Sequence, residues 1–200
     1  MVIIISADEI KKTLPNYDPE KSEQFHTESA RMADRDFDKA IKSSPYKSVV
    51  LLSGGTASGK TEFLVTQLTR KRCVVLDATL TTEKGAGIKI KKIKNLGKCP
   101  IIYSIIPDDL NRAFIAFLNR DRKFSDEHFY RTHSGARSTL LWIAQEHSDV
   151  EINIIESSYT EDQTLQFAKI EFDSKKQMIE YLTSKQVSET DIITEIQSKL

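Results

Sequence analysis

The sequence contains few cysteines. It has two, Cys73 and Cys99, and each stands beside an apolar run. A disulfide or metal framework would need more cysteines at ligand spacing. We therefore expect both thiols to be buried and the protein to work in a reduced, cytoplasmic setting.

Long apolar runs and an excess of one charge are also absent. The opening MVIIIS is too short for a signal-peptide core, and no run approaches the roughly 20 apolar residues that cross a bilayer. Lys plus Arg and Asp plus Glu both number 29, so no overall field attracts nucleic acid or an acidic membrane. We expect a soluble protein without a membrane or nucleic-acid partner.

The residues that are present predict an α/β fold. The chain has 200 residues, 39% of them hydrophobic and 29% charged, which is typical of a globular protein with its own core. Apolar strands are predicted at residues 49–52, 73–76, 100–106 and 150–157. Because helical stretches separate them, we expect βαβ units and a mainly parallel sheet flanked by helices in a three-layer sandwich.

The first 47 residues differ from the rest of the chain. A short helical piece near residues 8–14 is followed by apolar side chains at helical spacing over residues 20–41. We interpret residues 1–47 as an N-terminal helical extension and residues 48–200 as the main domain. The last 36 residues predict one strand and one or two helices.

Local signals set several helix ends within the domain. A helix is expected from Lys60 to about Arg70. Gly97 is expected to end a lysine-rich helix over residues 83–96. Asp108 is expected to N-cap the next helix, and a further helix is expected to begin near Ser125.

A glycine-rich loop carries the most specific motif. GGTASGKT fits G-x-x-x-x-G-K-[ST] between a buried strand and a helix, the context that the motif requires. Its N–H groups and the helix N-terminus would hold phosphates, Lys60 would reach the β- and γ-phosphates, and Thr61 would ligate Mg²⁺. A glycine-rich turn without a ligand is the alternative. The predicted nucleotide-binding residues are Gly54, Gly55, Thr56, Ala57, Ser58, Gly59, Lys60 and Thr61. We therefore expect the three-layer sandwich to be P-loop NTPase-like, with residues 48–200 as a P-loop kinase-like domain.

An acid follows the next buried strand. In CVVLDAT, Asp77 comes directly after four apolar residues, and ligands of open α/β sheets bind at the carboxyl ends of strands. Asp77 could hold magnesium through water or accept the proton of an attacking hydroxyl. A solvent-facing acid or a helix cap is the alternative, and Thr79 is a weaker candidate from the same turn.

An arginine-rich segment follows the helix after the third strand. Arg120 and Arg122 stand where small P-loop kinases carry a mobile lid, whose arginines stabilise the charge of the transferring phosphoryl group. Surface pairing with nearby acids is the alternative. For Arg131 and Arg137 we expect the structural role.

The lysines and histidines give weaker signals. The lysines of residues 84–98 are expected to form a solvated helix face, and the four histidines have no zinc-like spacing. His128 and His133 stand near the lid, but each is expected to be an ordinary surface or core-edge histidine.

In this order, the motifs resemble the zeta toxin family, P-loop kinases of bacterial toxin–antitoxin systems. The stretches that carry the resemblance are LLSGGTASGKTEFL, VVLDATLTTEKGAGIKIKKIKNLGKCPIIYSII and PDDLNRAFIAFLNRDRKFSDEHF, and the match covers roughly residues 49–146. The resemblance implies transfer of the γ-phosphate of Mg-ATP or Mg-GTP to a hydroxyl of a nucleotide-like small molecule, and an antitoxin-like partner. Carried over, Lys60, Asp77, Arg120 and Arg122 would be the catalytic residues.

One departure concerns the acceptor side. Family kinases place a strand ending in the catalytic aspartate, with an acceptor-binding region, between the phosphate-loop helix and the strand that ends here at Asp77. In this chain only Lys71 and Arg72 separate Arg70 from Cys73. Asp77 has then taken over the base role, or the acceptor differs, or the protein is a nucleotide-binding interaction module without catalysis. A polynucleotide-end kinase is disfavoured by the zero net charge, and elements before Ser48 could rebuild part of the missing wall.

Overall fold

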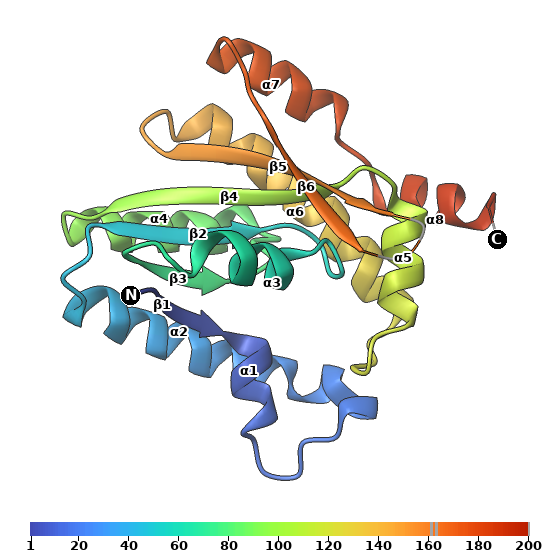
Figure 1. The fold of residues 1–200 in the computed structure, drawn as a ribbon, viewed down its shortest axis with the longest axis horizontal. Coiled ribbons are helices and arrows are strands. Elements are labelled where there is room, and N and C mark those ends of the chain that lie inside the picture. Colours follow the sequence, from blue (N-terminus) through green and yellow to red (C-terminus); the bar gives the residue numbers. More distant parts are fainter. Residues whose placement is uncertain (161, 163, 200) are drawn as a thin grey trace.

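One six-stranded sheet runs through the molecule in the order β1-β3-β2-β4-β5-β6 (Figure 1). A computed structural model describes residues 1–160, 162 and 164–199. The strands are β1 (Ile3–Ser6), β2 (Ser48–Ser53), β3 (Cys73–Asp77), β4 (Cys99–Pro107), β5 (Glu151–Tyr159) and β6 (Leu165–Ile170). Every pairing from β1 to β5 is parallel, and β6 pairs with β5 in antiparallel register. The expected mainly parallel α/β sheet is confirmed.

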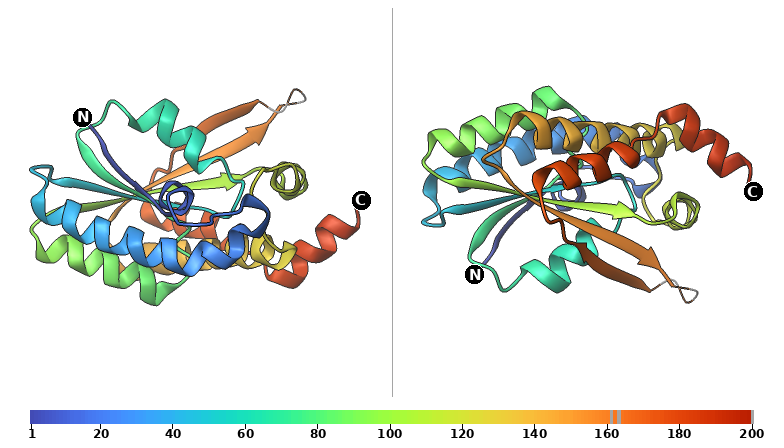
Figure 2. Two further views of the ribbon diagram at one scale, coloured as in Figure 1. Left: turned by 90° about the horizontal axis from the view of Figure 1, so that it is seen from below. Right: turned by 90° about the horizontal axis from the view of Figure 1, so that it is seen from above.

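Helices cover the two faces of the sheet unequally (Figure 2). The helices are α1 (Ala7–Lys12), α2 (His26–Ser43), α3 (Lys60–Phe63), α4 (Glu83–Asn95), α5 (Leu110–Leu118), α6 (Asp126–Glu146), α7 (Lys175–Ser184) and α8 (Glu189–Gln197), with the 3-10 helix η1 (Pro19–Phe25) and the π-helix η2 (Leu64–Leu68). One face packs against α2, α4, α6 and α7, and the other against α3 and η2. The third layer of the sandwich is therefore thin.

The alternation of side chains along β2 explains how both layers form. Val49 and Leu51 lie in the larger core with α2 and α4, while Val50 and Leu52 lie in the smaller core under α3. All four are at most 1% exposed. A strand that is covered on both faces must be apolar at every position, which is why its sequence reads as a continuous apolar run.

The N-terminal segment belongs to the central sheet. Ile3–Ser6 forms β1, which pairs with β3 in the register Ile3↔Val74 to Ser6↔Asp77. Three successive β-branched isoleucines favour this strand. The description of residues 1–47 as a helical extension is therefore corrected to include a strand of the sheet. The boundary at residue 47 stays a prediction.

Three local expectations are also corrected. Cys73 is buried, but Cys99 is exposed, because the alternation of β4 places it on the thinly covered face of the sheet. Asp109, and not Asp108, caps α5, because β4 continues through Pro107 and the carboxylate of Asp109 accepts from the first helical N–H groups. The helix that begins at Lys60 changes to π geometry at Leu64 and ends at Leu68.

The parallel strands place their carboxyl ends at one edge of the sheet. β1 ends at Ser6, β3 at Asp77 and β2 at Ser53, and the register sets the ends of β1 and β3 side by side. Beside them, α5 and α8 pack on the first turns of α6 around Phe114 and Phe129. Within the described residues, no helix combines the length and the apolar character of a membrane span.

Candidate phosphate-binding site

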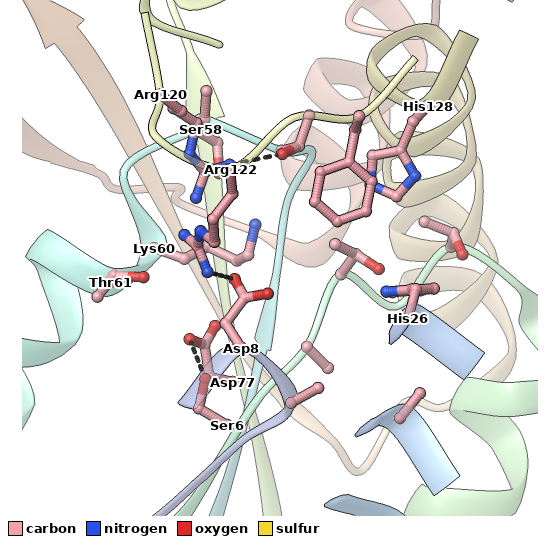
Figure 3. A pocket seen from close by; sticks show the side chains of 18 of the residues that line it. Ser6, Asp8, His26, Ser58, Lys60, Thr61, Asp77, Arg120, Arg122 and His128 are labelled. Carbon is pink, nitrogen blue, oxygen red and sulfur yellow. Dashed lines mark hydrogen bonds and ion pairs between the residues drawn. The ribbon is translucent and has the colours of Figure 1, made fainter. Parts of the chain in front are cut away.

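A cleft of about 920 Å³ opens at this edge of the sheet (Figure 3). The phosphate loop forms one side of the cleft, and residues of the N-terminal segment, of the turn after β3 and of the segment between α5 and α6 form the rest. The predicted residues Lys60, Thr61, Asp77, Arg120 and Arg122 all line it. The structure therefore brings together, in one cavity, residues that are 62 positions apart in the sequence.

The phosphate loop needs its glycines. Gly54 has φ 137° and Gly59 has φ 89°, both in a region that favours glycine, and Ala57 between them has φ 57°. A Cβ atom on Gly54 would lie 2.4 Å from the carbonyl oxygen of Ile105, and one on Gly55 would overlap the ring of His133 at the same distance. The motif thus encodes a backbone shape that other residues could not adopt here.

Side chains from outside hold the carbonyl groups of the loop. Three successive carbonyls each accept a hydrogen bond at 2.8 Å: Thr56 from His133 Nε2, Ala57 from the Tyr159 hydroxyl and Ser58 from the Ser157 hydroxyl. Because His133 donates through Nε2, its neutral ring carries the proton on that atom. Burial lowers the pKa of His133 to about 3. With their carbonyl groups fixed on the outside, these peptide units leave N–H groups for the cavity.

Several N–H groups of the loop are free to bind a ligand. Among the described residues, no acceptor pairs with the N–H groups of Gly55, Ala57, Gly59, Lys60 and Thr61. The hydroxyl of Ser58 is buried and also has no partner within the described part of the chain. Buried polar groups are normally paired, so this concentration of free donors fits an anion such as phosphate.

Lys60 lies folded across the loop. Its Nζ donates to the carbonyl oxygens of Gly54 at 2.8 Å and Gly55 at 2.7 Å. Burial lowers the pKa of Lys60 to about 8, although the carboxylate of Asp77 acts in the opposite direction. A partly buried ammonium with only carbonyl partners would gain from a nearby phosphate.

Asp77 lies at the end of β3 beside residues of β1 (Figure 3). The hydroxyl of Ser6 donates to its Oδ2 at 3.3 Å. Burial raises the pKa of Asp77, while Lys60 acts to lower it. Asp77 is half-buried and lines the cleft, so it is neither a fully exposed acid nor a helix cap; Thr82 caps the next helix instead.

The two arginines of the segment between α5 and α6 both reach the cleft. Arg120 donates to the Thr56 hydroxyl at 2.8 Å, and Arg122 forms an ion pair of 2.5 Å with Asp8. Lys11, which is fully buried, lies 3.5 Å from the other oxygen of Asp8. Among the described residues, neither arginine pairs with Asp121, Asp126 or Glu127, the nearby acids of the surface-pairing alternative.

Sequence reasoning missed Asp8, Ser6 and His133. The rule that singled out Asp77, an acid just after an apolar strand, applies equally to VIIISAD at the N-terminus, and could have identified Asp8. We expect an ordinary role for His133 from the sequence, but in the structure its Nε2 donates to the Thr56 carbonyl and so supports the phosphate loop. No short motif marks such a support, because the sequence separates His133 from Thr56 by 77 positions.

Aromatic side chains form a wall away from the phosphate loop. Phe124 stacks on His128 with ring centroids 4.3 Å apart, and His26 lies 5.6 Å from His128. Burial lowers the pKa of His128 to about 4, helped by repulsion from His26. His128 is therefore neutral at pH 7 and offers a flat, uncharged surface to the cleft.

The other lysines and arginines do not line the cleft, apart from Lys12 and Lys89. Arg131 is exposed, Arg137 is buried, and neither lines the cleft, so the structural role expected for both stays a prediction. Lys89 and Lys92 of α4 pair with Asp34 and Asp38 of α2. The lysine-rich helix face is thus largely a set of contacts with α2 and solvent.

The residues at the loop fit a nucleotide-bound magnesium ion. Mg²⁺ uses few protein ligands in such sites, typically one hydroxyl and one carboxylate with phosphates and water. Thr61 is exposed to the cleft and Asp77 lines it, so both donor types are present. Within the part of the chain that the structure describes, no cluster of three or more His, Cys, Asp or Glu side chains could hold a metal by itself.

The comparisons with known proteins concern the fold. No protein-family model and no curated protein matches the sequence. Among solved structures, chains of the AvrRxo1-ORF1:AvrRxo1-ORF2 complex are similar, in crystals with ATP (TM-score 0.51), with sulphate ions (0.51) and in native form (0.52). Each match is 15% identical and covers 86% of this chain and 75% of the other. The zeta toxin resemblance stays a prediction, and the likeness shows an α/β fold with a mostly parallel six-stranded sheet shared with a complex crystallised with ATP.

Proposed function

We propose that the protein is a P-loop phosphotransferase that moves the γ-phosphate of Mg-ATP or Mg-GTP to a hydroxyl of a nucleotide-like small molecule. The observation that carries this proposal is the phosphate loop, with its free N–H groups and Lys60, facing carboxylates across one polar cleft. The fold shared with a complex crystallised with ATP supports it.

The phosphate loop would bind the donor. Its free N–H groups and the start of α3 would hold the phosphate oxygens. Lys60 would exchange the carbonyl groups of Gly54 and Gly55 for phosphate oxygens, which are stronger partners for an ammonium. The side chains that fix the carbonyls of Thr56 to Ser58 would keep the loop in this shape before the nucleotide arrives, so little reorganisation is needed.

The arginines would act on the transferring group. Arg120 and Arg122 lie on a segment that reaches the loop and the opposite side of the cleft. Charge spreads over the γ-phosphoryl oxygens during transfer, and guanidinium groups close to those oxygens stabilise it. The basic and acidic side chains that line the cleft are equal in number, five of each, so the support for a polyanionic ligand comes from the position of Lys60 and Arg120 at the phosphate loop and not from a surplus of positive charge.

Thr61 and Asp77 would hold the magnesium ion, Thr61 directly and Asp77 through water. When bound, the ion would neutralise charge on the phosphates and orient them. Asp77 is also a candidate to accept the proton of the attacking hydroxyl, as its position at the end of β3 permits.

The alternative function is a nucleotide-binding interaction module without catalysis. Such a protein would have a filled surface beside Asp77, with no room for an acceptor. The space beside Asp77 is instead a hollow with polar walls, which Ser6, Asp8 and Arg122 help to line. This observation favours transfer over binding alone. An antitoxin-like protein partner stays a prediction from the family resemblance, and a cytoplasmic location stays a prediction from the low cysteine content.

The test of the proposed function uses radiolabelled ATP and the wild-type protein beside Lys60→Ala. Lys84→Ala is the matched control, because Lys84 is exposed on α4 and does not line the cleft. We expect Mg-ATP to raise the melting temperature of the wild type and of Lys84→Ala, and label to pass to compounds in a mixture of nucleosides, nucleotides and nucleotide sugars. Lys60→Ala should lose about 10–100-fold in Mg-ATP affinity and more in transfer.

Two results would contradict the proposal. If Mg-ATP stabilises the wild type but label moves to no compound, the protein is a binding module. If neither Mg-ATP nor Mg-GTP stabilises the wild type, the protein is not a nucleotide-binding protein. Labelling of an oligonucleotide with a 5′-hydroxyl, in place of the small molecules, would indicate a polynucleotide-end kinase.

A further inference from the structure

Asp8 occupies the position that lies next outward from Asp77 along the sheet. The phosphate loop follows β2, Asp77 ends β3, and Asp8 follows β1 in the first turn of α1, while the strand order is β2, then β3, then β1. Adjacent strands lie about 4.8 Å apart. Along this edge of the sheet, the phosphate loop is therefore followed by Asp77 and then by Asp8. Phosphoryl transfer needs the same spatial order, with the donor first, then the transferred group, then the acceptor.

Asp8 is held and yet accessible. Arg122 contacts one of its oxygens at 2.5 Å and Lys11 lies 3.5 Å from the other. Lys11 is itself fixed, with its Nζ 4.6 Å above the Phe124 ring and 3.4 Å from the Ser22 hydroxyl. The side chain of Asp8 is nevertheless 38% exposed and lines the cleft. A ligand in the cleft can thus reach a carboxylate that is positioned before the ligand binds.

We propose that Asp8 is the acceptor-side catalytic carboxylate, which takes the proton of the attacking hydroxyl. This inference rests on the proposed phosphotransferase function. In the step, the acceptor oxygen forms a bond to the γ-phosphorus, and the bond between that phosphorus and the bridging oxygen breaks. Its electron pair leaves with the nucleoside diphosphate. The proton of the acceptor hydroxyl passes to a carboxylate oxygen of Asp8 and afterwards to water.

Asp8 fits this role better than Asp77 does. Asp77 lies one strand nearer to the phosphate loop, where it faces Lys60 and the predicted magnesium position, and one of its oxygens already accepts from Ser6. Asp8 lies beyond it, on the side of the aromatic wall. Burial acts to raise the pKa of Asp8, but Arg122 and Lys11 outweigh it and hold that pKa below its ordinary value. The carboxylate is therefore ionised at pH 7.

Arg122 links Asp8 to the donor. In the structure it pairs with Asp8, and in the proposed function it contacts the transferring phosphoryl group. When Arg122 turns toward the phosphate, Asp8 loses a strong cationic partner and becomes a better proton acceptor. The same movement therefore neutralises the donor and activates the base. The N-terminal segment thereby supplies the carboxylate that the family places after the phosphate-loop helix.

The test compares Asp8→Asn with Glu9→Gln. Glu9 is exposed on the same short helix and pairs with Lys12, so its variant also removes one negative charge from α1. The assay follows label from radiolabelled ATP into the mixture of nucleosides, nucleotides and nucleotide sugars, and Mg-ATP affinity is measured separately. We expect Asp8→Asn to lower kcat by about 100- to 1,000-fold while its Kd for Mg-ATP stays within about twofold of the wild type. Glu9→Gln should transfer label like the wild type.

A second measurement separates catalysis from loss of structure. Asp8→Asn leaves the buried Lys11 without its carboxylate partner, so the melting temperature of each variant is recorded. Asp8→Ala is then assayed with added sodium formate, whose small carboxylate can occupy the vacated space. We expect formate to restore transfer in a concentration-dependent way. The rate of the wild type should also fall on an acid limb of the pH profile that Asp8→Asn lacks. The charged and titratable groups that face Asp8 are Lys11, His26, Lys60, Asp77, Arg120 and Arg122.

The possible failures are distinguishable. If the wild type moves no label, the proposed function fails and the reaction assigned to Asp8 fails with it. If the wild type and Asp8→Asn move label equally, only the assignment of Asp8 fails. If Asp8→Asn weakens Mg-ATP binding as much as it slows transfer, and formate rescues neither, Asp8 only anchors Arg122 and the inference is wrong.

Discussion

The donor side of the cleft comes from one continuous stretch of chain, whereas the opposite side comes from three. Residues 54–61 form the phosphate loop, while residues 6–34, 76–89 and 116–128 provide most of the facing wall. The loop is fixed by hydrogen bonds of 2.8 Å from three side chains outside it. The facing wall is connected by the ion pairs between Asp8 and Arg122 and between Asp34 and Lys89, and by the hydrogen bond between Ser6 and Asp77.

For the proposed function, this difference teaches how the two tasks of a transferase, donor binding and acceptor binding, can be separated. A triphosphate has the same shape in every nucleotide, so its site gains from a rigid, preorganised backbone. An acceptor differs from one enzyme to another, and a wall built from separate segments can change one segment at a time. In this chain the segment before the phosphate loop, not the one after it, provides the outer part of that wall.

The largest expected effect tests the rigidity of the donor side. In Gly54→Ala, the new Cβ would lie 2.4 Å from the Ile105 carbonyl oxygen, at a φ of 137° that alanine avoids. We expect a loss of at least about 1–3 kcal/mol in the free energy of unfolding and no thermal stabilisation by Mg-ATP. Gly87→Ala is the control, since its Cβ would lie 3.2 Å from Trp142, outside the cleft. An active Gly54→Ala protein would show that the loop is not rigid.

The next effect concerns His133, which supports the phosphate loop, and the free energy of unfolding at acid pH. His133 has an ordinary pKa near 6.5 when unfolded and a pKa of about 3 in the folded protein, because it is buried. Between these values the unfolded state binds more protons, so the free energy of unfolding falls as the pH falls from 6.5 toward 3. At pH 4 the loss relative to pH 7 is about 3 kcal/mol.

His133→Gln isolates this contribution, because an amide can still donate to the Thr56 carbonyl but does not titrate. Urea unfolding at pH 7 and pH 4 should show a smaller acid loss in the variant than in the wild type. His128→Gln makes the same test on the opposite side, where the folded pKa of about 4 predicts a smaller change. An equal loss in the free energy of unfolding from pH 7 to pH 4 in the wild type and in His133→Gln would mean that His133 is not buried in its neutral form.

A roughly fivefold effect is expected at Lys60 in alkaline solution. Its pKa is about 8 in the free protein, and a bound phosphate favours the charged ammonium. Binding above pH 8 therefore requires the uptake of a proton by Lys60, and the Kd for Mg-ATP should rise about fivefold from pH 8 to pH 9. Calorimetric titration in buffers of different ionisation enthalpy measures this uptake. Lys60→Arg should bind with the same Kd at both values, and a wild type that behaves likewise would contradict the lowered pKa.

The donor side could be predicted from the sequence because its information is local. The motif from Gly54 to Thr61 encodes a backbone shape within eight residues, and the apolar runs around it predict the parallel sheet. Asp77 was identified by the same local rule. Arg120 and Arg122 were placed by their order after the third strand, and the structure brings both to the cleft.

The facing wall could not be predicted in the same way, because it depends on which strands become neighbours. The sequence does not state that Ile3–Ser6 pairs with β3, and only this pairing brings Ser6 and Asp8 to Asp77. A short strand of three isoleucines before a helix is equally compatible with a buried helix start. The support by His133 depends on the packing of α6 under the loop, a contact across 77 residues.

The smallest effect tests whether Ser6 tunes Asp77. Its hydroxyl donates to Asp77 Oδ2 at 3.3 Å and so favours the ionised carboxylate against burial, which raises the pKa. In Ser6→Ala we expect a loss of about 0.5–1.5 kcal/mol in the free energy of unfolding and transfer slowed by a few fold, with the acid limb of the rate profile unmoved, because that limb reports the ionisation of Asp8. Ser53→Ala is the control, since Ser53 also ends a strand and its buried hydroxyl has no partner within the described residues. An acid limb moved to higher pH in Ser6→Ala would mean that the protonation of Asp77 limits transfer, and would contradict the assignment of the proton acceptor to Asp8.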